Sequence, residues 1–214
     1  MAITNGYCTL AQIRSELGYQ TAETADDTKL EQSVAAASRQ IDGHCGQRFW
    51  VDGSVVDRQY YPDNPSWLDV TDYDDGAGIS TTTGLVVKLD DDDSGTYETT
   101  LTVNTDFILE PLNAADRTPV WPYTVIRMTG LNYWFKRSMY ARPLVQVSAK
   151  FGWPAVPDDV TKACLIQAAA LFKAKDAVFG GVALGDTGAA LFVRSALSPL
   201  AVALLEPYRK PAVG

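Results

Sequence analysis

The spacing of hydrophobic and polar residues changes twice along the chain. From residue 9 to residue 43 the apolar side chains recur every three or four positions, which is the pattern of amphipathic helices. Thr9 and Gln12 have the spacing of a capping box and Gly18 is a typical helix end, so a first helix is predicted there. A second helix is predicted from Asp26 or Asp27 to the glycines at 43 and 46. The apolar stripes of the two helices are Leu10, Ile13 and Leu17, then Leu30, Val34, Ala37 and Ile41.

From Phe49 onward the helical period gives way to short runs of β-branched and aromatic residues between turn residues. This pattern predicts about six or seven strands. Asp90 to Asp93, followed by Ser94 and Gly95, are expected to form a hairpin turn. The number and spacing of the strands fit a small antiparallel sheet or barrel. The predicted strands cover residues 55–61, 67–70, 85–89, 97–103, 107–109, 125–128 and 144–151.

The helical period returns after Pro157, where Asp158 is expected to start a helix. Residues 180–188 are too rich in glycine for regular structure and are expected to form a mobile loop. Ser198 and Pro199 predict the start of a last helix, which ends at Pro207. The expected stripes are Val160, Cys164, Gln167, Ala168, Leu171 and Phe172 in one helix, and Leu200, Ala203 and Leu204 in the other.

These elements predict an α+β protein in which the two ends of the chain form one helical bundle. Residues 1–48 supply its N-terminal part, and residues 157–214, with the glycine-rich loop 180–188, supply its C-terminal part. Residues 49–156 are then an inserted antiparallel β domain.

The composition is that of an ordinary globular protein, with 46% hydrophobic and 21% charged residues. The start of the chain lacks the pattern of a signal peptide, and the apolar stretch from Ala163 to Phe172 is too short to span a membrane. We therefore expect a protein made in the cytoplasm, with no membrane partner. Three separated cysteines, Cys8, Cys45 and Cys164, are expected to be buried and reduced.

The net charge of −8 is unevenly distributed along the chain. Residues 52–116 contain fifteen acidic residues and two basic ones, whereas residues 117–157 contain six basic residues and no acidic one. The two segments either neutralise each other within one domain or meet across neighbouring subunits. The acidic total argues against a protein whose main task is to grip a nucleic-acid backbone.

No catalytic motif is present, and no cofactor is expected. The segment from Gly180 to Thr187 approaches the spacing of a phosphate-binding loop, but Asp186 replaces the required lysine. His44 is the single histidine, which excludes a histidine-based triad. Its neighbour Cys45 is expected to point in a different direction, and no second histidine or nearby cysteine completes a set of metal ligands. The acidic clusters at residues 69–75 and 90–93 lack the spacing of a calcium-binding EF-hand and are expected to be solvated turns.

Residues 133–142 interleave aromatic and cationic side chains. Such a segment is typical of a protein interface, of the solvated edge of a core, or of a surface on which nucleic-acid bases stack. The composition of the segment leaves these three possibilities open.

Several segments of the chain together resemble the head–tail connector (adaptor) proteins of tailed phages. They are YCTLAQIRSELGY, DDTKLEQSVAAASRQIDGHCGQRF, TDFILEPLNA, FGWPAVPDDVTKACLIQAAALF and LSPLAVALLEPYRK, in that order. The resemblance touches both ends of the chain and several points of the middle. Some connectors are nearly all helical, so the β insertion departs from the family.

The resemblance implies a non-enzymatic virion protein of the neck, assembled in the host cytoplasm. Copies would form a twelve-fold ring beneath the portal, extend the channel for double-stranded DNA, and offer a platform to the next neck or tail-completion protein. The expected subunit contacts are Trp134, Lys136, Arg137 and Arg142 with Asp72, Asp74 and Asp75. The expected portal contacts are Gly180, Gly181, Gly185, Phe192, Arg194, Tyr208, Arg209 and Lys210, in mobile elements.

Two other functions remain possible from the sequence. A β domain could bind Ca²⁺ or carbohydrate through its aspartate loops, or a hydrolase could use the carboxylates of residues 69–75 and 90–93.

Overall fold

The computed structural model describes residues 3–20, 24–71, 75–130, 133–174, 182–184, 189–191 and 197–210. The chain divides into two compact units. The helical unit comprises residues 1–47 and 156–214, and the β unit comprises residues 48–155. Helices and antiparallel sheets occupy different segments, so the predicted α+β class is confirmed.

None of the helices in the described part of the chain has the length and apolar character needed to cross a membrane.

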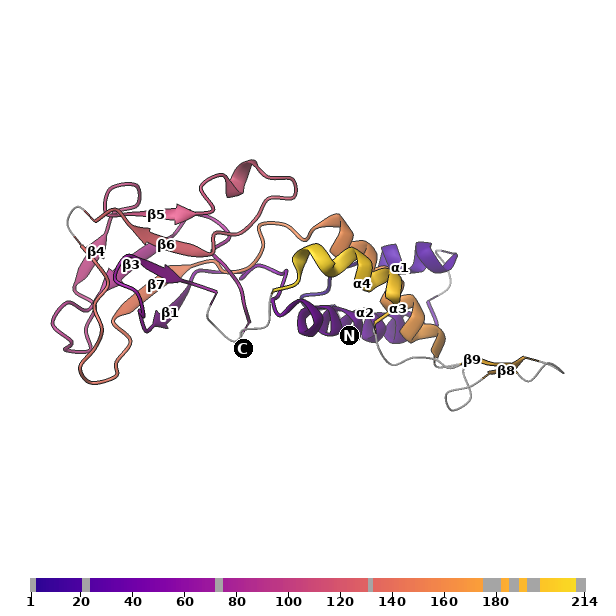
Figure 1. The fold of residues 1–214 in the computed structure, drawn as a ribbon. Coiled ribbons are helices and arrows are strands. Elements are labelled where there is room, and N and C mark those ends of the chain that lie inside the picture. The colour runs from indigo at the N-terminus through magenta and orange to yellow at the C-terminus, as the bar shows by residue number, and fades with distance from the viewer. Residues whose placement is uncertain are drawn as a thin grey trace. The chain divides into compact units, whose positions relative to one another are not determined.

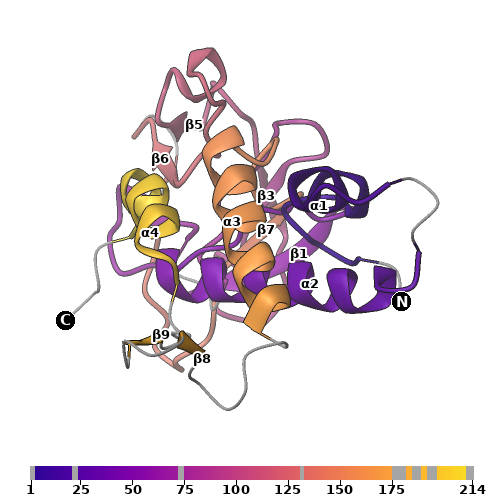
Figure 2. The ribbon, with the colours of Figure 1, turned by 90° about the vertical axis from the view of Figure 1, so that its right-hand side faces the viewer.

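In the helical unit, α3 lies centrally and packs against α1, α2 and α4 (Figure 2). A short 3-10 helix, η4, follows α4, and two short strands, β8 and β9, pair antiparallel. The bounds are Leu10–Leu17 for α1, Asp27–Cys45 for α2, Asp158–Ala174 for α3, Val182–Leu184 for β8, Ala189–Leu191 for β9, Pro199–Leu205 for α4 and Glu206–Tyr208 for η4.

The first two helices begin and end close to where the sequence predicts. Thr9 and Gln12 form the capping box of α1, and Gly18 ends that helix with φ +76°, a conformation that favours glycine. Helix α2 ends at Gly46 with φ +64°, so the prediction that Gly43 helps to end it is wrong. Gly43 is an interior residue of α2, because a single glycine costs a helix only about 1 kcal/mol.

The core of the helical unit is mainly apolar, with one buried amide that joins three helices. Gln167 on α3 donates to the side chain of Gln40 on α2 at 2.8 Å and accepts the backbone N–H of Ser198, before α4, at 2.9 Å. All three cysteines are buried and free, as predicted, and the sulfur atoms of Cys8 and Cys164 lie 3.4 Å apart. The core side chains are Ile13, Leu30, Val34, Ala37, Ile41, Cys45, Val160, Ala163, Cys164, Ala168, Phe172, Ala201, Leu205 and Tyr208.

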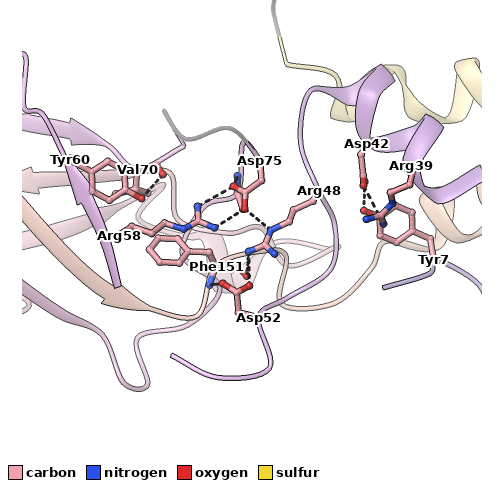
Figure 3. A network of polar contacts seen from close by, with 11 residues as sticks. Tyr7, Arg39, Asp42, Arg48, Asp52, Arg58, Tyr60, Val70, Asp75 and Phe151 are labelled. Atoms are coloured by element: carbon pink, nitrogen blue, oxygen red, sulfur yellow. Dashed lines mark hydrogen bonds and ion pairs between the residues drawn. The ribbon is translucent and has the colours of Figure 1, made fainter. Parts of the chain in front are cut away.

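The segment before α1 packs on α2. The backbone N–H of Tyr7 donates to Ser38 at 3.1 Å, and the Tyr7 hydroxyl donates to Asp42 (Figure 3). The Arg39 guanidinium pairs with Asp42 at 3.2 Å and donates to the carbonyl of Asn5 at 2.9 Å. These bonds hold residues 5–7 along the helix.

Two predictions for the C-terminal part are wrong. Residues 182–184 form β8, although the glycine-rich stretch was expected to lack regular structure. The Val-Ala-Leu triplet between the glycines is long enough to pair with β9. The predicted apolar side of α4 is also wrong, since Leu200 is 60% exposed while Ala201 and Leu205 are fully buried. This helix is apolar on several sides, so periodicity alone could not select the buried one.

In the β unit, all seven predicted strands form, and they make two antiparallel sheets. One sheet has the order β1-β7-β3-β4 and the other has the order β2-β6-β5. Strands β5 and β6 lie above β1, β3 and β7 in Figure 1. The bounds are Val56–Tyr60 for β1, Trp67–Asp69 for β2, Val86–Leu89 for β3, Thr99–Leu101 for β4, Phe107–Glu110 for β5, Val125–Met128 for β6 and Val145–Ala149 for β7, with the 3-10 helix η1 at Ala114–Asp116.

The inward side chains of both sheets share one core. The alternation of buried and half-buried positions along β3, β6 and β7 gives each strand one inward face. The core includes Leu68, Val87, Leu89, Leu101, Phe107, Leu109, Ile126, Val145, Val147 and Phe151.

Ile79 joins the two sheets through its backbone. It exchanges hydrogen bonds of 2.8 Å with Tyr123, beside β6, and forms a bridge with Phe151, beyond β7. Gly152 has φ +124°, and a Cβ there would lie 2.1 Å from the carbonyl oxygen of Trp50. Glycine is required at this position because two backbone segments approach closely.

The two leucines of α4 provide a matched test of the observed packing. We expect Leu205→Ala to lower the free energy of unfolding by about 2–4 kcal/mol, because it leaves a cavity in the core. Leu200→Ala should change it by less than roughly 0.5 kcal/mol, because Leu200 is exposed. Urea denaturation of the two purified variants measures both values, and equal effects would contradict the observed orientation of α4.

Candidate interaction surface

Three loops meet at one end of the β unit. Tyr60 at the end of β1 and Leu89 at the end of β3 both pair with Val145, the first residue of β7. The loops that follow β1 and β3, and the loop that precedes β7, therefore emerge at the same end of the sheet. The backbone N–H of Phe135 also donates to the carbonyl of Pro65 at 2.9 Å, which joins the first and the third loop.

The basic residues of the third loop pair with acidic loops of the same chain. Lys136 contacts the carboxylate of Asp91 at 3.2 Å, and Arg137 contacts that of Asp63 at 2.9 Å. Arg142 donates to a backbone carbonyl in the turn after β3 at 2.9 Å. For these residues, the segregated charges neutralise each other within one unit, which is one of the two arrangements that the sequence allows.

A tight turn at residues 138–142 is organised by one hydroxyl and one carboxylate. The Ser138 hydroxyl donates to both carboxylate oxygens of Asp93 at 2.8 Å. It also accepts the backbone N–H groups of Tyr140 and Arg142, at 2.9 and 3.0 Å. Ala141 within the turn has φ +54°, a conformation that side chains rarely adopt. The hydrogen bonds around it hold the turn in one shape.

Four large apolar side chains of these loops are exposed, here named the apolar tip and defined as Tyr61, Trp134, Met139 and Tyr140. Their exposed fractions are 62%, 60%, 90% and 70%. Phe135, next to Trp134, is only 3% exposed and belongs to the core, so it anchors the loop that carries the tip. Exposed tryptophan, tyrosine and methionine are enriched at protein interfaces.

Of the predicted subunit-contact residues, Trp134, Lys136, Arg137 and Arg142 thus lie together in one loop. Tyr61, Met139 and Tyr140 were not selected from the sequence, although the last two stand inside the aromatic and basic segment. Ser138 and Asp93 organise the turn. The sequence did not indicate their contact, because the two residues are 45 positions apart.

Asp75, the described member of the predicted acidic contacts, lies in a different place (Figure 3). Its carboxylate accepts two hydrogen bonds from Arg58, at 3.0 and 2.6 Å, and contacts Arg48 Nε at 2.9 Å. Arg48 also contacts Asp52 at 2.7 Å. Both arginines are nearly buried, so Asp75 is engaged inside its own unit. Asp72 and Asp74 lie outside the described residues.

Burial and charge act in opposite directions on the Asp75 carboxyl. Burial would raise its pKa, but hydrogen bonds from Arg58 and the Ala77 backbone, together with the charges of Arg58 and Arg48, lower the pKa below its usual range. The guanidinium groups also stack on aromatic rings, Arg48 at 3.6 Å from the Trp50 centroid and Arg58 at 3.9 Å from that of Phe151.

The turn after β3 brings carboxylates together, as the calcium hypothesis requires. Ligand oxygens of Asp90, Asp92 and Glu98 lie within 4.8 Å of one another. Asp90 is buried and accepts the backbone N–H groups of Ser94 and Gly95, at 3.0 and 2.7 Å. The Asp90 carboxylate therefore caps the hairpin turn that the sequence predicts.

The predicted portal contacts fall into two groups. Gly180, Gly181, Gly185, Phe192 and Arg194 lie outside the residues whose side chains are described.

The second group consists of Tyr208, Arg209 and Lys210. These residues are docked on the helical unit, so the expectation that they are mobile is wrong. Tyr208 is 5% exposed and its hydroxyl donates to Asp159 at 3.2 Å. The backbone N–H of Lys210 donates to the carbonyl of Cys45 at 2.9 Å, and the side chain of Arg209 is 55% exposed. The apolar ring of Tyr208 fills the core beside α2 and α3, which the sequence stretch Tyr-Arg-Lys did not indicate.

Comparison with known structures finds a similar fold in chains of gene transfer agent particles. No protein-family model matches the sequence, and no curated protein matches it. The chain is similar to one in the neck of an empty gene transfer agent (GTA) particle, computed with C6 symmetry, with 18% identity and a TM-score of 0.56. A chain in the virion of a native gene transfer agent particle has 19% identity and a TM-score of 0.52.

Both similarities extend over 100% of this chain and 94% of the other. At these identities the similarity is one of fold, and it agrees with the resemblance to head–tail connectors. It includes the β insertion, which departs from the nearly all-helical connectors.

The Asp75 cluster gives a prediction about acid stability. Asp75→Asn removes the carboxylate between two nearly buried arginines, so we expect the free energy of unfolding at pH 7 to fall by roughly 2–4 kcal/mol. Because the folded-state pKa is lowered, the stabilisation by Asp75 is complete above about pH 4 and is lost as the pH falls through the folded value. The variant should therefore lose less stability than the wild type on acidification, as measured by urea denaturation between pH 7 and pH 3.

Asp63→Asn is the matched control, because it removes the carboxylate of an exposed ion pair. The side chains of Asp63 and its partner Arg137 are 85% and 75% exposed. It should cost less than about 1 kcal/mol. A pH dependence unchanged by Asp75→Asn would contradict the assigned role of the cluster.

Proposed function

We propose that this chain is a structural protein of a phage-like virion, the head–tail connector that joins the portal to the next neck component. The observation that carries the proposal is the fold similarity to a chain of a particle neck, over the whole length of this chain. The resemblance of the helical segments to connector proteins supports the same function independently.

In this proposal the protein acts by assembly, without catalysis. Copies form a twelve-fold ring beneath the portal after DNA packaging, and the ring extends the DNA channel. The net charge of −8 supports this role, because a net negative ring repels the phosphates of the DNA that passes through it and does not hold them. The ring is assembled in the host cytoplasm and becomes part of the virion neck.

The proposed subunit contacts centre on the loop that carries Trp134. Lys136, Arg137 and Arg142 support this loop through their contacts with the same chain, and Trp134 offers the exposed ring that a neighbour would cover. On the helical unit, Arg209 and Lys210 are the described candidates for portal contact, and Tyr208 holds their segment in place.

Deletion of the gene tests the proposal in cells that produce the particles. We expect heads filled with DNA but without tails, because the portal would lack its adaptor, and electron microscopy of purified particles would reveal them. Wild-type protein supplied from a plasmid should restore tailed particles. Normal numbers of tailed particles without the gene would contradict the proposal.

A further inference from the structure

We infer that Cys8 and Cys164 form a reversible disulfide bond, which covalently joins the two separate stretches of chain that make up the helical unit. The oxidant is a peroxide, and the bond forms after the protein has folded with free thiols. The chemistry of the pair is independent of the proposed function. Its timing rests on that function, because the thiols stay reduced in the host cytoplasm and are oxidised once the particle has left the cell.

The two sulfur atoms are already in contact. Cys8 Sγ and Cys164 Sγ lie 3.4 Å apart, within hydrogen-bond distance, and the exposed fractions of the two residues are 4% and 0%. A disulfide bond is about 2.0 Å long, so its formation brings the sulfur atoms closer by about 1.4 Å. Small adjustments of the two side chains and their backbone supply a shift of this size without unpacking the helices.

The chain neighbours of Cys8 hold it beside Cys164. The backbone N–H of Tyr7 donates to Ser38 on α2 at 3.1 Å, and the Ser38 oxygen lies 3.5 Å from the sulfur of Cys164. On the other side of Cys8, Thr9 is the N-cap of α1 and is fixed by its capping box. Cys8 is thus held on both sides, so an oxidised Cys164 has its partner in place.

Cys164 is the thiol that reacts first with the oxidant. The hydrogen bond between the two thiols lowers the pKa of Cys164, although burial opposes this, and the same bond and burial both raise the pKa of Cys8. Cys164 therefore supplies the thiolate, which is the nucleophilic form of cysteine. Hydrogen peroxide is small and needs only a local opening of the segment before α1 to reach the pair.

The reaction has two steps. The Cys164 thiolate attacks one oxygen of the peroxide, which breaks the O–O bond, leaves a sulfenic acid and releases hydroxide, and this hydroxide takes up the proton that the thiol has lost. The Cys8 sulfur then attacks the sulfenic sulfur and expels its hydroxyl group, which leaves as water with the Cys8 proton. Two thiols lose two electrons to one peroxide, and the products are one disulfide and two water molecules.

The third cysteine differs from this pair. Burial, together with the charges of Asp42 and Glu206, raises the pKa of the Cys45 thiol to about 12. Cys45 is therefore protonated at neutral pH and is a poor nucleophile. It is fully buried, as Cys164 is, so the contact between sulfur atoms, and not burial, distinguishes the reactive pair.

The bond closes the helical unit covalently. This unit is built from residues 1–47 and 156–214, which are connected along the chain through the β unit. The two stretches meet where α1 and α2 pack on α3. A disulfide between positions 156 residues apart strongly restricts the unfolded chain, and it strains the folded state little because the sulfur atoms already touch. The oxidised protein is therefore the more stable form, which suits a particle that persists outside the cell.

Peptide mapping of the purified protein tests the pairing. The protein is treated with a small molar excess of hydrogen peroxide, its remaining thiols are blocked with N-ethylmaleimide in urea, and it is digested with trypsin. The three cysteines fall in different peptides, 1–14, 40–48 and 163–173. We expect 1–14 joined to 163–173 and released by dithiothreitol, and 40–48 carrying maleimide. Three blocked thiols, a sulfinic acid at Cys164 or a bond that includes Cys45 would overturn the inference.

Cys8→Ala and Cys45→Ala are the matched controls for this experiment, with the melting temperature as a second readout. Peroxide should raise the melting temperature of the wild type by at least about 5 °C over that of its reduced form. Cys45→Ala should show the same shift, since it keeps both sulfur atoms of the pair, and Cys8→Ala should show none. A shift of equal size in Cys8→Ala would contradict the inference.

The state of the pair in particles tests the timing. Producing cells are quenched in acid, released particles are collected from the medium, and both samples are treated with maleimide and mapped in the same way. We expect free thiols inside the cells and the joined peptides in released particles. Released particles that contain the protein with all its thiols free would overturn the inference and leave the proposed function intact. Particles that lack the protein altogether would overturn the proposed function.

Discussion

The β unit depends on the clamp of Asp75 between Arg58 and Arg48. Arg48 is the first residue of the unit, Arg58 lies in the middle of β1, and Asp75 lies before the segment that joins the two sheets. One carboxylate thus fixes three segments that are far apart in the sequence. Two nearly buried guanidinium groups would be costly without it, and the rings of Trp50 and Phe151 cover their faces. The clamp holds β1, and Tyr61 lies in the loop that directly follows this strand.

Ion pairs also link the loops at the end of the sheet, but they are more exposed than the clamp. Asp63 and Asp91 hold the cations of the loop before β7, and Asp93 holds its turn. The acidic and basic segments of the sequence therefore serve, in these residues, to order one unit. Once the charges are matched internally, what the loop offers to a partner is its apolar side chains. The loop before β7 thus pairs its charges within the chain and leaves its apolar side chains exposed for a partner.

The sequence predicted most of the elements, because each carries its own local signal. The strands follow runs of β-branched residues, and the capping box of α1 is formed by two side chains only three positions apart. Predictions failed where tertiary packing decides. Leu200 and Leu205 are equally apolar, and only the position of α3 decides which is buried. Similarly, Tyr208 was assigned to a mobile ending because its partner Asp159 is 49 residues away. The contact of Ser138 with Asp93 was missed for the same reason, and it organises the candidate surface.

A fold shared at 18% identity places few constraints on surface residues. Core positions such as Val147 and Ile126 need only remain apolar and of similar size, whereas a contact between subunits needs two surfaces that match each other. The contacts of the proposed ring can therefore differ from those of the similar structures while the fold persists, so they have to be found from the exposed residues of this chain. Met139 is the most exposed of the large hydrophobic side chains in the described part of the chain, at 90%, and its backbone N–H donates to Asp93 at 2.9 Å. Its side chain would be stabilised only by a surface that covers it.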